Sequence, residues 1–220
     1  MKSHQTLYSE PPQRTEDLPL KEDKELEGLL WVEFLRGSDK ALAEIYRIYS
    51  KKLFNYGRQF TKCDDLIYDT IQDVFIYLVD AREKLAVAKS VRFYLFSVFR
   101  RTLLKALEKD KNVVNPEKEA LEGFLISVND EYHPVNEFIN ERHKKLIMTA
   151  VNQLPARQRE MLTLRFFEGM SYEQIAAMMD LANAKTVRTM MYRSFSRLNK
   201  VLAPLKKVIY TAFLLVLTGI

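Results

Sequence analysis

The stretch that decides the fold spans residues 154–198 and reads LPARQREMLTLRFFEGMSYEQIAAMMDLANAKTVRTMMYRSFSRL. Pro155 suits the first position of a helix, and Gly169 suits its C-terminal end. Ser171 and Gln174 have the spacing of a capping box, which predicts the start of a second helix. Asn183 is the best cap for a third. The positions predicted to face inward are Leu154, Met161, Leu162, Phe166, Ile175, Ala176 and Met179. A short helix, a tight turn and a longer helix predict a helix-turn-helix unit.

The helix after Asn183 has two chemically different faces. At roughly 100° per residue, one face collects Val187, Met191, Ser194 and Leu198. The other face collects basic and hydrogen-bonding side chains, namely Lys185, Arg188, Thr189, Tyr192, Arg193 and Ser196, with Lys200 beside them. Such side chains pair with base edges and phosphates, so this face is predicted to bind DNA in the major groove. The alternative is an ordinary amphipathic helix with a solvated basic face. Residues 183–207 contain seven Lys or Arg and no acidic residue, which favours DNA.

A second helical block precedes this one. Residues 64–79 read DDLIYDTIQDVFIYLV and predict a helix whose buried face is Ile67, Ile71, Val74 and Leu78. Its opposite face carries Asp65, Asp69, Gln72 and Asp73. An acidic face within a basic domain suits contact with a basic protein surface, although most charged faces are merely solvated.

Two further helices are predicted around this one. One has a stripe of Leu42, Ile45, Tyr46, Tyr49 and Leu53; the other runs from about Arg92 to Leu107. In the latter, Phe93, Phe96 and Phe99 are assigned to the core, and Tyr94 lies off that stripe.

Composition sets the fold class. Among 220 residues, 47% are hydrophobic and 29% charged, and there are only 6 Gly and 7 Pro, which is typical of an all-α globular protein. Cys63 is the single cysteine and the three His are scattered, so we expect no disulfide, metal or cofactor. Residues 41–111 and 139–207 are basic, with an acidic connector between them. Two helical domains joined by a flexible linker are therefore predicted. The segments are a flexible arm (1–25), a first domain (26–109), a linker (110–136), a helix-turn-helix domain (137–204) and an apolar tail (205–220).

These segments resemble a known family. Residues 154–198 are similar to region 4 of extracytoplasmic-function (ECF) sigma factors, and residues 64–79 with VRFYLFSVFRRTLLKAL (91–107) resemble region 2. The resemblance implies a sigma factor that binds core RNA polymerase and directs promoter-specific transcription initiation. It assigns polymerase binding to Asp65, Asp69, Gln72 and Asp73. Recognition of the −35 element falls to the basic face of the last helix.

The resemblance also assigns the −10 promoter element to the first domain. Its unpaired bases and phosphates need cations and aromatic rings. The candidates are Arg92, Tyr94, Arg100, Arg101 and Lys105. Family members are often held by an anti-sigma factor, so such a partner is expected too. Asp180 stands where relatives often have Gly, and it tolerates the left-handed conformation that the turn requires.

Other readings remain open. No nucleotide-binding loop, catalytic triad or metal-ligand spacing occurs in the sequence, so we predict that the protein is not an enzyme. The N-terminus has no apolar core typical of a secretory signal, which favours a cytoplasmic protein. A helix-turn-helix repressor or activator that acts without polymerase is the main alternative. The uncharged residues 208–220 are too short to span a bilayer as a helix; packing on the protein is favoured over membrane-surface or anti-sigma contact.

Overall fold

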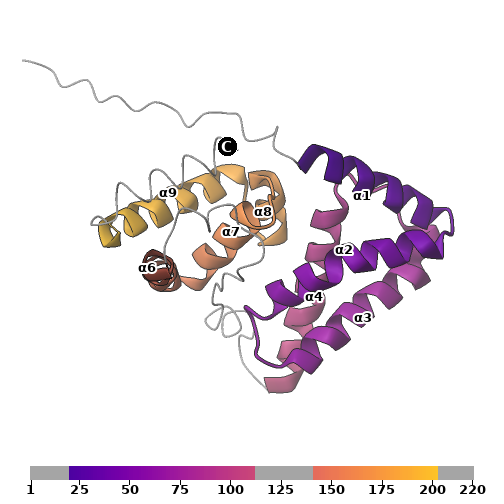
Figure 1. The fold of residues 1–220 in the computed structure, drawn as a ribbon, viewed down its shortest axis with the longest axis horizontal. Coiled ribbons are helices and arrows are strands. Elements are labelled where there is room, and N and C mark those ends of the chain that lie inside the picture. Colours follow the sequence, from indigo (N-terminus) through magenta and orange to yellow (C-terminus); the bar gives the residue numbers. More distant parts are fainter. Residues whose placement is uncertain (1–19, 112–140, 203–220) are drawn as a thin grey trace, which may run out of the picture.

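The computed structural model describes residues 20–111 and 141–202, which form two helical units (Figure 1). No strand occurs within these ranges, in agreement with the all-α prediction. The predicted linker and tail lie outside the described residues, apart from the linker's first two positions. The first helix begins at Leu20, inside the range predicted as a flexible arm, whose remaining residues also lie outside.

The N-terminal unit packs four helices around an aromatic core. They are α1 (Leu20–Leu35), α2 (Asp39–Gly57), α3 (Asp64–Ala81) and α4 (Val91–Lys111), with a 3₁₀ turn, η1 (Arg82–Lys84), after α3. The core contains Trp31, Phe34, Tyr49, Tyr56, Phe96 and Phe99, all essentially inaccessible to water. Burial of such large rings is the main stabilising contribution in a unit of this size.

Local sequence explains where these helices begin and which face they bury. The Ser38 hydroxyl accepts from the Ala41 amide and caps α2. The predicted stripe of α3 is confirmed, because Ile67, Ile71, Val74 and Leu78 are all buried. The stripe of α2 is only partly right. Tyr46 is 43% exposed, with its ring edge-on to Phe75 at 4.9 Å, so it covers the core rather than filling it.

The C-terminal unit contains the predicted helix-turn-helix. Its helices are α6 (Glu141–Asn152), α7 (Ala156–Phe166), α8 (Tyr172–Met178) and α9 (Ala184–Val201). The capping box is confirmed by two hydrogen bonds. The backbone N–H of Gln174 donates to Ser171 Oγ at 3.2 Å, and the backbone N–H of Ser171 donates to Gln174 Oε1 at 2.9 Å. The Thr186 amide donates to Asn183 Oδ1 at 3.0 Å, which caps α9.

Three backbone positions define the ends and turns of this unit. Pro155 is the N-cap of α7 rather than its first helical residue. Gly169 follows α7 with φ 61°, and Asp180 in the turn between α8 and α9 has φ 52°. The left-handed turn at Asp180 therefore forms without glycine, as predicted.

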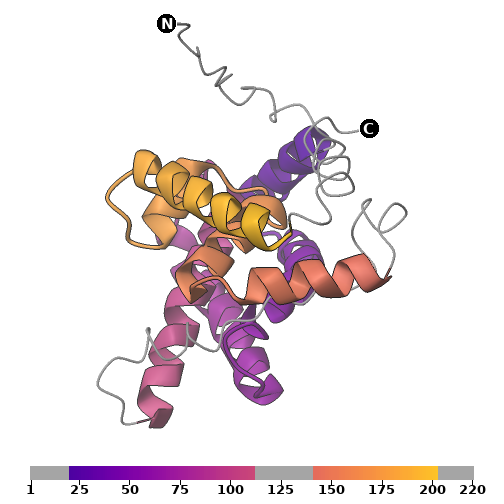
Figure 2. The ribbon, with the colours of Figure 1, turned by 90° about the vertical axis from the view of Figure 1, so that its left-hand side faces the viewer.

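The two units lie against each other. Helices α7 and α8 lie on the side of their unit that is turned toward α1–α4, whereas α6 and α9 lie on the side turned away (Figures 1 and 2). Buried side chains of both units belong to one continuous hydrophobic core. The predicted DNA-binding helix therefore faces outward, and a different helix of the same unit contacts the N-terminal unit.

Candidate nucleic-acid and protein interfaces

The basic face of α9 is open to solvent along its whole length. All six predicted contact residues are exposed: Lys185, Arg188, Thr189, Tyr192, Arg193 and Ser196. Tyr192 is 69% exposed, an unusual position for a large ring. On the opposite face Val187, Met191 and Ser194 are buried, as the angular pattern predicts, and Leu198 is half-buried. Burial of one face holds the other in a fixed orientation toward a ligand.

Arg188 is held in place by neighbours on α8. Its guanidinium lies 5.2 Å from the centre of the Tyr172 ring, and Nη2 is 3.8 Å from a Glu173 carboxylate oxygen. Both contacts are exposed and therefore weak. Arg188 is thus steered toward the outer side of the helix-turn-helix and remains available to a phosphate or a base edge.

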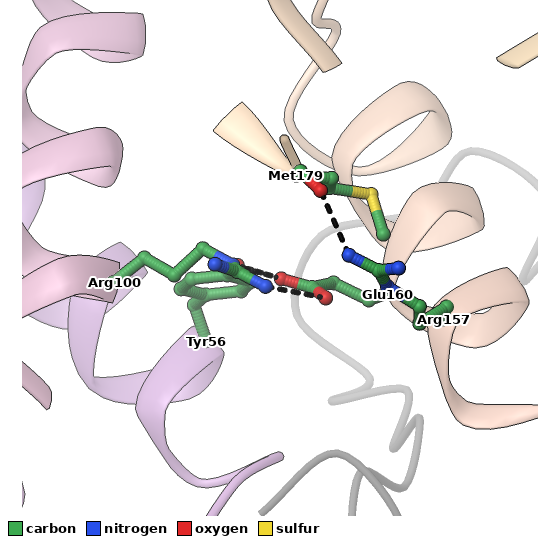
Figure 3. A network of polar contacts seen from close by, with 5 residues as sticks. All are labelled: Tyr56, Arg100, Arg157, Glu160 and Met179. Atoms are coloured by element: carbon green, nitrogen blue, oxygen red, sulfur yellow. Dashed lines mark hydrogen bonds and ion pairs between the residues drawn. The ribbon is translucent and has the colours of Figure 1, made fainter. Parts of the chain in front are cut away.

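A second group of arginines, all on α7, supports the helix-turn-helix unit by donating to backbone carbonyls. Their role was not predicted from the sequence. Arg157 Nη2 donates to the Met179 carbonyl at 2.9 Å, which ties α7 to the end of α8 (Figure 3). Arg165 Nη1 donates to the Met170 carbonyl at 2.9 Å. Arg159 donates to the carbonyls of Asn152 and Leu154, and burial lowers its pKa. Helix ends leave unpaired carbonyls, so cations spaced along α7 are the signal that suggests this role.

The predicted polymerase-binding face of α3 is also exposed. Asp65, Asp69, Gln72 and Asp73 all lie at the surface. Among the residues that the structure describes, none of these three carboxylates forms an ion pair, whereas the neighbouring Asp64 pairs with Arg58. Ile76 lies one turn beyond Asp73 and is 57% exposed. Unpaired carboxylates beside an exposed aliphatic side chain suit a protein partner better than a nucleic acid.

The predicted −10 residues on α4 fall into three environments. Arg101 and Lys105 are exposed. Tyr94 is half-buried with its ring 5.3 Å from that of Trp31; burial and a hydrogen bond with Tyr77 raise its pKa to about 12. Arg92 donates to Glu27 at 3.0 Å and to the Glu168 carbonyl at 3.2 Å. Arg100 is buried.

Arg100 belongs to a buried polar network between the units (Figure 3). Its Nε donates to Glu160 Oε1 at 2.6 Å and its Nη2 to Glu160 Oε2 at 3.3 Å. The Tyr56 hydroxyl donates to Glu160 Oε1 at 2.7 Å. Burial and the Glu160 carboxylate raise the pKa of Tyr56 well above its ordinary value, so the phenol stays protonated as a donor. Nothing in the local sequence pattern indicates this network.

Two family models match the chain, one on each unit. The model described as Sigma-70 region 2 matches residues 45–113, and the model described as Sigma-70, region 4 matches residues 144–198. Together they span more than half of the chain. The first covers α3 and α4, and the second covers the helix-turn-helix.

Curated relatives agree with this assignment. The chain is 24% identical over 178 residues to the ECF RNA polymerase sigma-E factor of Escherichia coli (strain K12), an alignment covering 77% of this chain and 91% of the relative. It is 23% identical over 146 residues to the RNA polymerase sigma factor SigV of Bacillus subtilis (strain 168), with 66% and 81% covered.

Solved structures share the fold. One is CnrH in complex with the cytosolic domain of CnrY, with TM-score 0.52, 18% identity, and 81% of this chain and 98% of that chain covered. Another is the sigma factor RpoE in complex with the anti-sigma factor NepR from Bartonella quintana, with TM-score 0.51, 22% identity, and 74% and 98% covered.

The matched segments explain what the two units are for. Sigma factors direct promoter-specific transcription initiation by bacterial RNA polymerase, region 4 binds the −35 element, and the family is not a family of enzymes. Regions 2 and 4 occur here in that order on the α3–α4 and α7–α9 helices. The chain belongs to the ECF group of the sigma-70 family.

Proposed function

We propose that this sigma factor divides its work between three surfaces. The exposed face of α3, with Asp65, Asp69, Gln72 and Asp73, binds core RNA polymerase. The basic face of α9 reads the −35 element. The exposed cations of α4 bind the −10 element, joined by Arg92 and Arg100 when the units separate. On this proposal residues 26–109 and 137–204 are the two functional domains.

The orientation of α9 carries the proposal. Its apolar face is buried against its own unit and all six predicted contact residues are exposed on the other face. That is the geometry of a recognition helix presented to the major groove. Side chains that form direct contacts with bases are expected to give sequence preference, whereas contacts with phosphates give affinity alone.

Further parts of the proposal concern partners and place of action. We assign the chemistry of transcription to the polymerase and none to this chain. We place the protein in the cytoplasm, where promoters and polymerase are; within the described ranges, every helix is too short or too polar to cross a bilayer. Because one solved structure of similar fold is a complex with an anti-sigma factor, we include such a regulator among the partners.

The rival function is that of a helix-turn-helix regulator that binds duplex DNA without polymerase. It leaves the exposed carboxylates of α3 without a role. Start-site mapping with purified components separates the two. Core polymerase, genomic DNA fragments and this protein are expected to give transcripts with defined 5′ ends that core polymerase alone does not give. If the complete mixture gives no transcripts with defined 5′ ends, the sigma function is refuted. Sequence-specific binding of duplex DNA by the protein alone supports the rival function.

A further inference from the structure

Within the described ranges, the Glu160 carboxylate accepts hydrogen bonds from side chains of the other unit. It lies on α7 with 0% of its surface exposed. The side chains that donate to it, Tyr56 on α2 and Arg100 on α4, both come from the N-terminal unit (Figure 3). Because these donors leave with the N-terminal unit, separation of the units returns Glu160 to water.

Two more polar contacts cross the same boundary. The Thr163 hydroxyl, one turn further along α7, donates to Gln59 Oε1 at 3.2 Å. Arg92 donates to the Glu168 carbonyl at 3.2 Å and at the same time to Glu27 of its own unit. Crossing contacts thus run from Arg92 to Arg100 along α4, and both arginines are among the five side chains assigned to the −10 element.

The chemistry of the contact resembles that of a nucleic-acid contact. An arginine fork recognises a carboxylate and a phosphate with the same paired N–H groups. In the closed arrangement Glu160 occupies the fork of Arg100 with its two oxygens. A DNA phosphate and Glu160 therefore compete for one guanidinium.

We propose that Glu160 is an intramolecular latch: it holds the C-terminal unit over Arg92 and Arg100, and the free protein must open at this contact before α4 can bind promoter DNA fully. The occlusion of DNA rests on the proposed function, whereas the closure itself does not.

The energetics suit a switch rather than a permanent joint. Desolvation of a buried ion pair largely offsets the attraction between its charges, so such a pair stabilises a closed state only modestly. Removal of one partner is different, because it leaves the other charge buried without compensation. Opening restores water to both groups, so the ion pair itself adds little to the free energy needed to separate the units.

The closure is tested by a distance measurement that needs neither DNA nor polymerase. Spin labels on Cys63, which is exposed, and on A177C, an exposed position of α8, report the separation of the units by pulsed electron spin resonance. A short, narrow distance distribution is expected for the wild-type background, and a longer, broader one for Glu160→Gln. Glu108→Gln is the control, since Glu108 is an exposed carboxylate near the other end of α4. An unchanged distribution in Glu160→Gln overturns the latch.

A milder variant protects the test against misfolding. Tyr56→Phe removes only the hydroxyl that donates to Glu160 and keeps the buried ring. It is expected to shift the distribution in the same direction as Glu160→Gln but less far. Circular dichroism establishes that each variant retains its helices, and a correctly folded Tyr56→Phe that stays closed counts against the latch.

The occlusion is tested separately, with unlabelled protein and a mixed-sequence single-stranded 20-mer. If the open form is about a tenth of the wild-type population, full opening raises the apparent affinity about tenfold. Glu160→Gln is therefore expected to bind more tightly than Glu108→Gln, which loses the same charge. Equal affinities of an opened variant and the control overturn the occlusion, and start-site selection by the wild type with core polymerase decides the proposed function independently.

Discussion

Glu160 and Arg100 lie 60 residues apart in the chain, one in each matched sigma-70 region, and form a buried pair with hydrogen bonds of 2.6 and 3.3 Å. The pair joins Arg100, which is assigned to the −10 element, to α7, the helix that supports the helix-turn-helix. On the proposed function, α7 is therefore the physical link between the α4 surface and the helix-turn-helix. Separation of the units breaks the hydrogen bonds between Arg100 and Glu160 and so removes a contact of α7 with the N-terminal unit.

Arg188→Ala and Arg193→Ala test the −35 assignment. Both side chains are exposed on α9, so the fold is expected to be unaffected. Loss of a bidentate base contact costs about 1–3 kcal/mol and relaxes the preference at one promoter position. Loss of a phosphate contact weakens binding uniformly and gives a shallower salt dependence. Fluorescence anisotropy of holoenzyme with matched and mutated −35 duplexes distinguishes them.

Lys145→Ala is the charge control for these variants. Lys145 is an exposed cation on α6, outside the predicted contact face. It is expected to bind every duplex as the wild type does. If Arg188→Ala and Arg193→Ala behave like Lys145→Ala, α9 is not the reading helix.

Asp69→Asn combined with Asp73→Asn tests the polymerase-binding face. Both carboxylates are exposed and, among the described residues, neither forms an ion pair, so stability should change little. Association with core polymerase is expected to be abolished, because the partner's cations lose their counter-charges. Co-elution with core polymerase in gel filtration measures the effect. The control is Glu83→Gln with Glu108→Gln, the same charge change at exposed positions elsewhere in the unit; co-elution of the Asp69/Asp73 variant at wild-type levels contradicts the assignment.

Local chemistry explains what the sequence could predict. The faces of α3 and α9, the capping box at Ser171 and the left-handed turn at Asp180 each depend on residues within a few positions of one another. Helical period, caps and turn residues are the strongest signals available in a single sequence. These predictions were confirmed by the structure.

The features that the sequence could not predict depend on long-range contacts. The donors to Glu160 come from residues 60 and 104 positions away, and no periodic pattern links them. An arginine beside a second arginine, as in Arg100 and Arg101, resembles a DNA contact until its partner is known. Helix α1 was missed because its stripe is irregular: Trp31 and Phe34 are buried, but Leu29 is 66% exposed.

Gly57→Ala tests how closely α2 approaches its neighbours. A methyl group at this position would lie 2.8 Å from Ile67 Cγ2 and 3.0 Å from Phe99 Cζ, both in the core. Overpacking of this kind costs about 1–3 kcal/mol, and urea unfolding measures it. Gly28→Ala is the matched control. Nothing lies within 4 Å of its added methyl in α1, so it should stabilise the protein by about 0.5–1 kcal/mol. Equal stabilities of the two variants would show that α2 is not so tightly packed.

Glu168 makes the contact between the units sensitive to pH. Burial raises the pKa of its carboxyl to about 7 from an ordinary 4.5, although the cations Arg92 and Lys52 oppose the rise. Tyr56 of the N-terminal unit also interacts electrostatically with Glu168, and burial keeps its hydroxyl protonated in this range by raising its pKa. Exposure to water returns the Glu168 pKa toward 4.5, so the closed form binds this proton more tightly than the open form.

The sign of the effect follows from that difference. The stabilisation of the closed form is complete below about pH 4.5 and is lost as pH rises through 7. The spin-label distance between Cys63 and A177C is therefore expected to lengthen between pH 5 and pH 8. Glu168→Gln, which cannot ionise, should remove that part of the change and stay closed at pH 8. If Glu168→Gln opens between pH 5 and pH 8 as the wild type does, the opening is linked to the ionisation of a group other than Glu168.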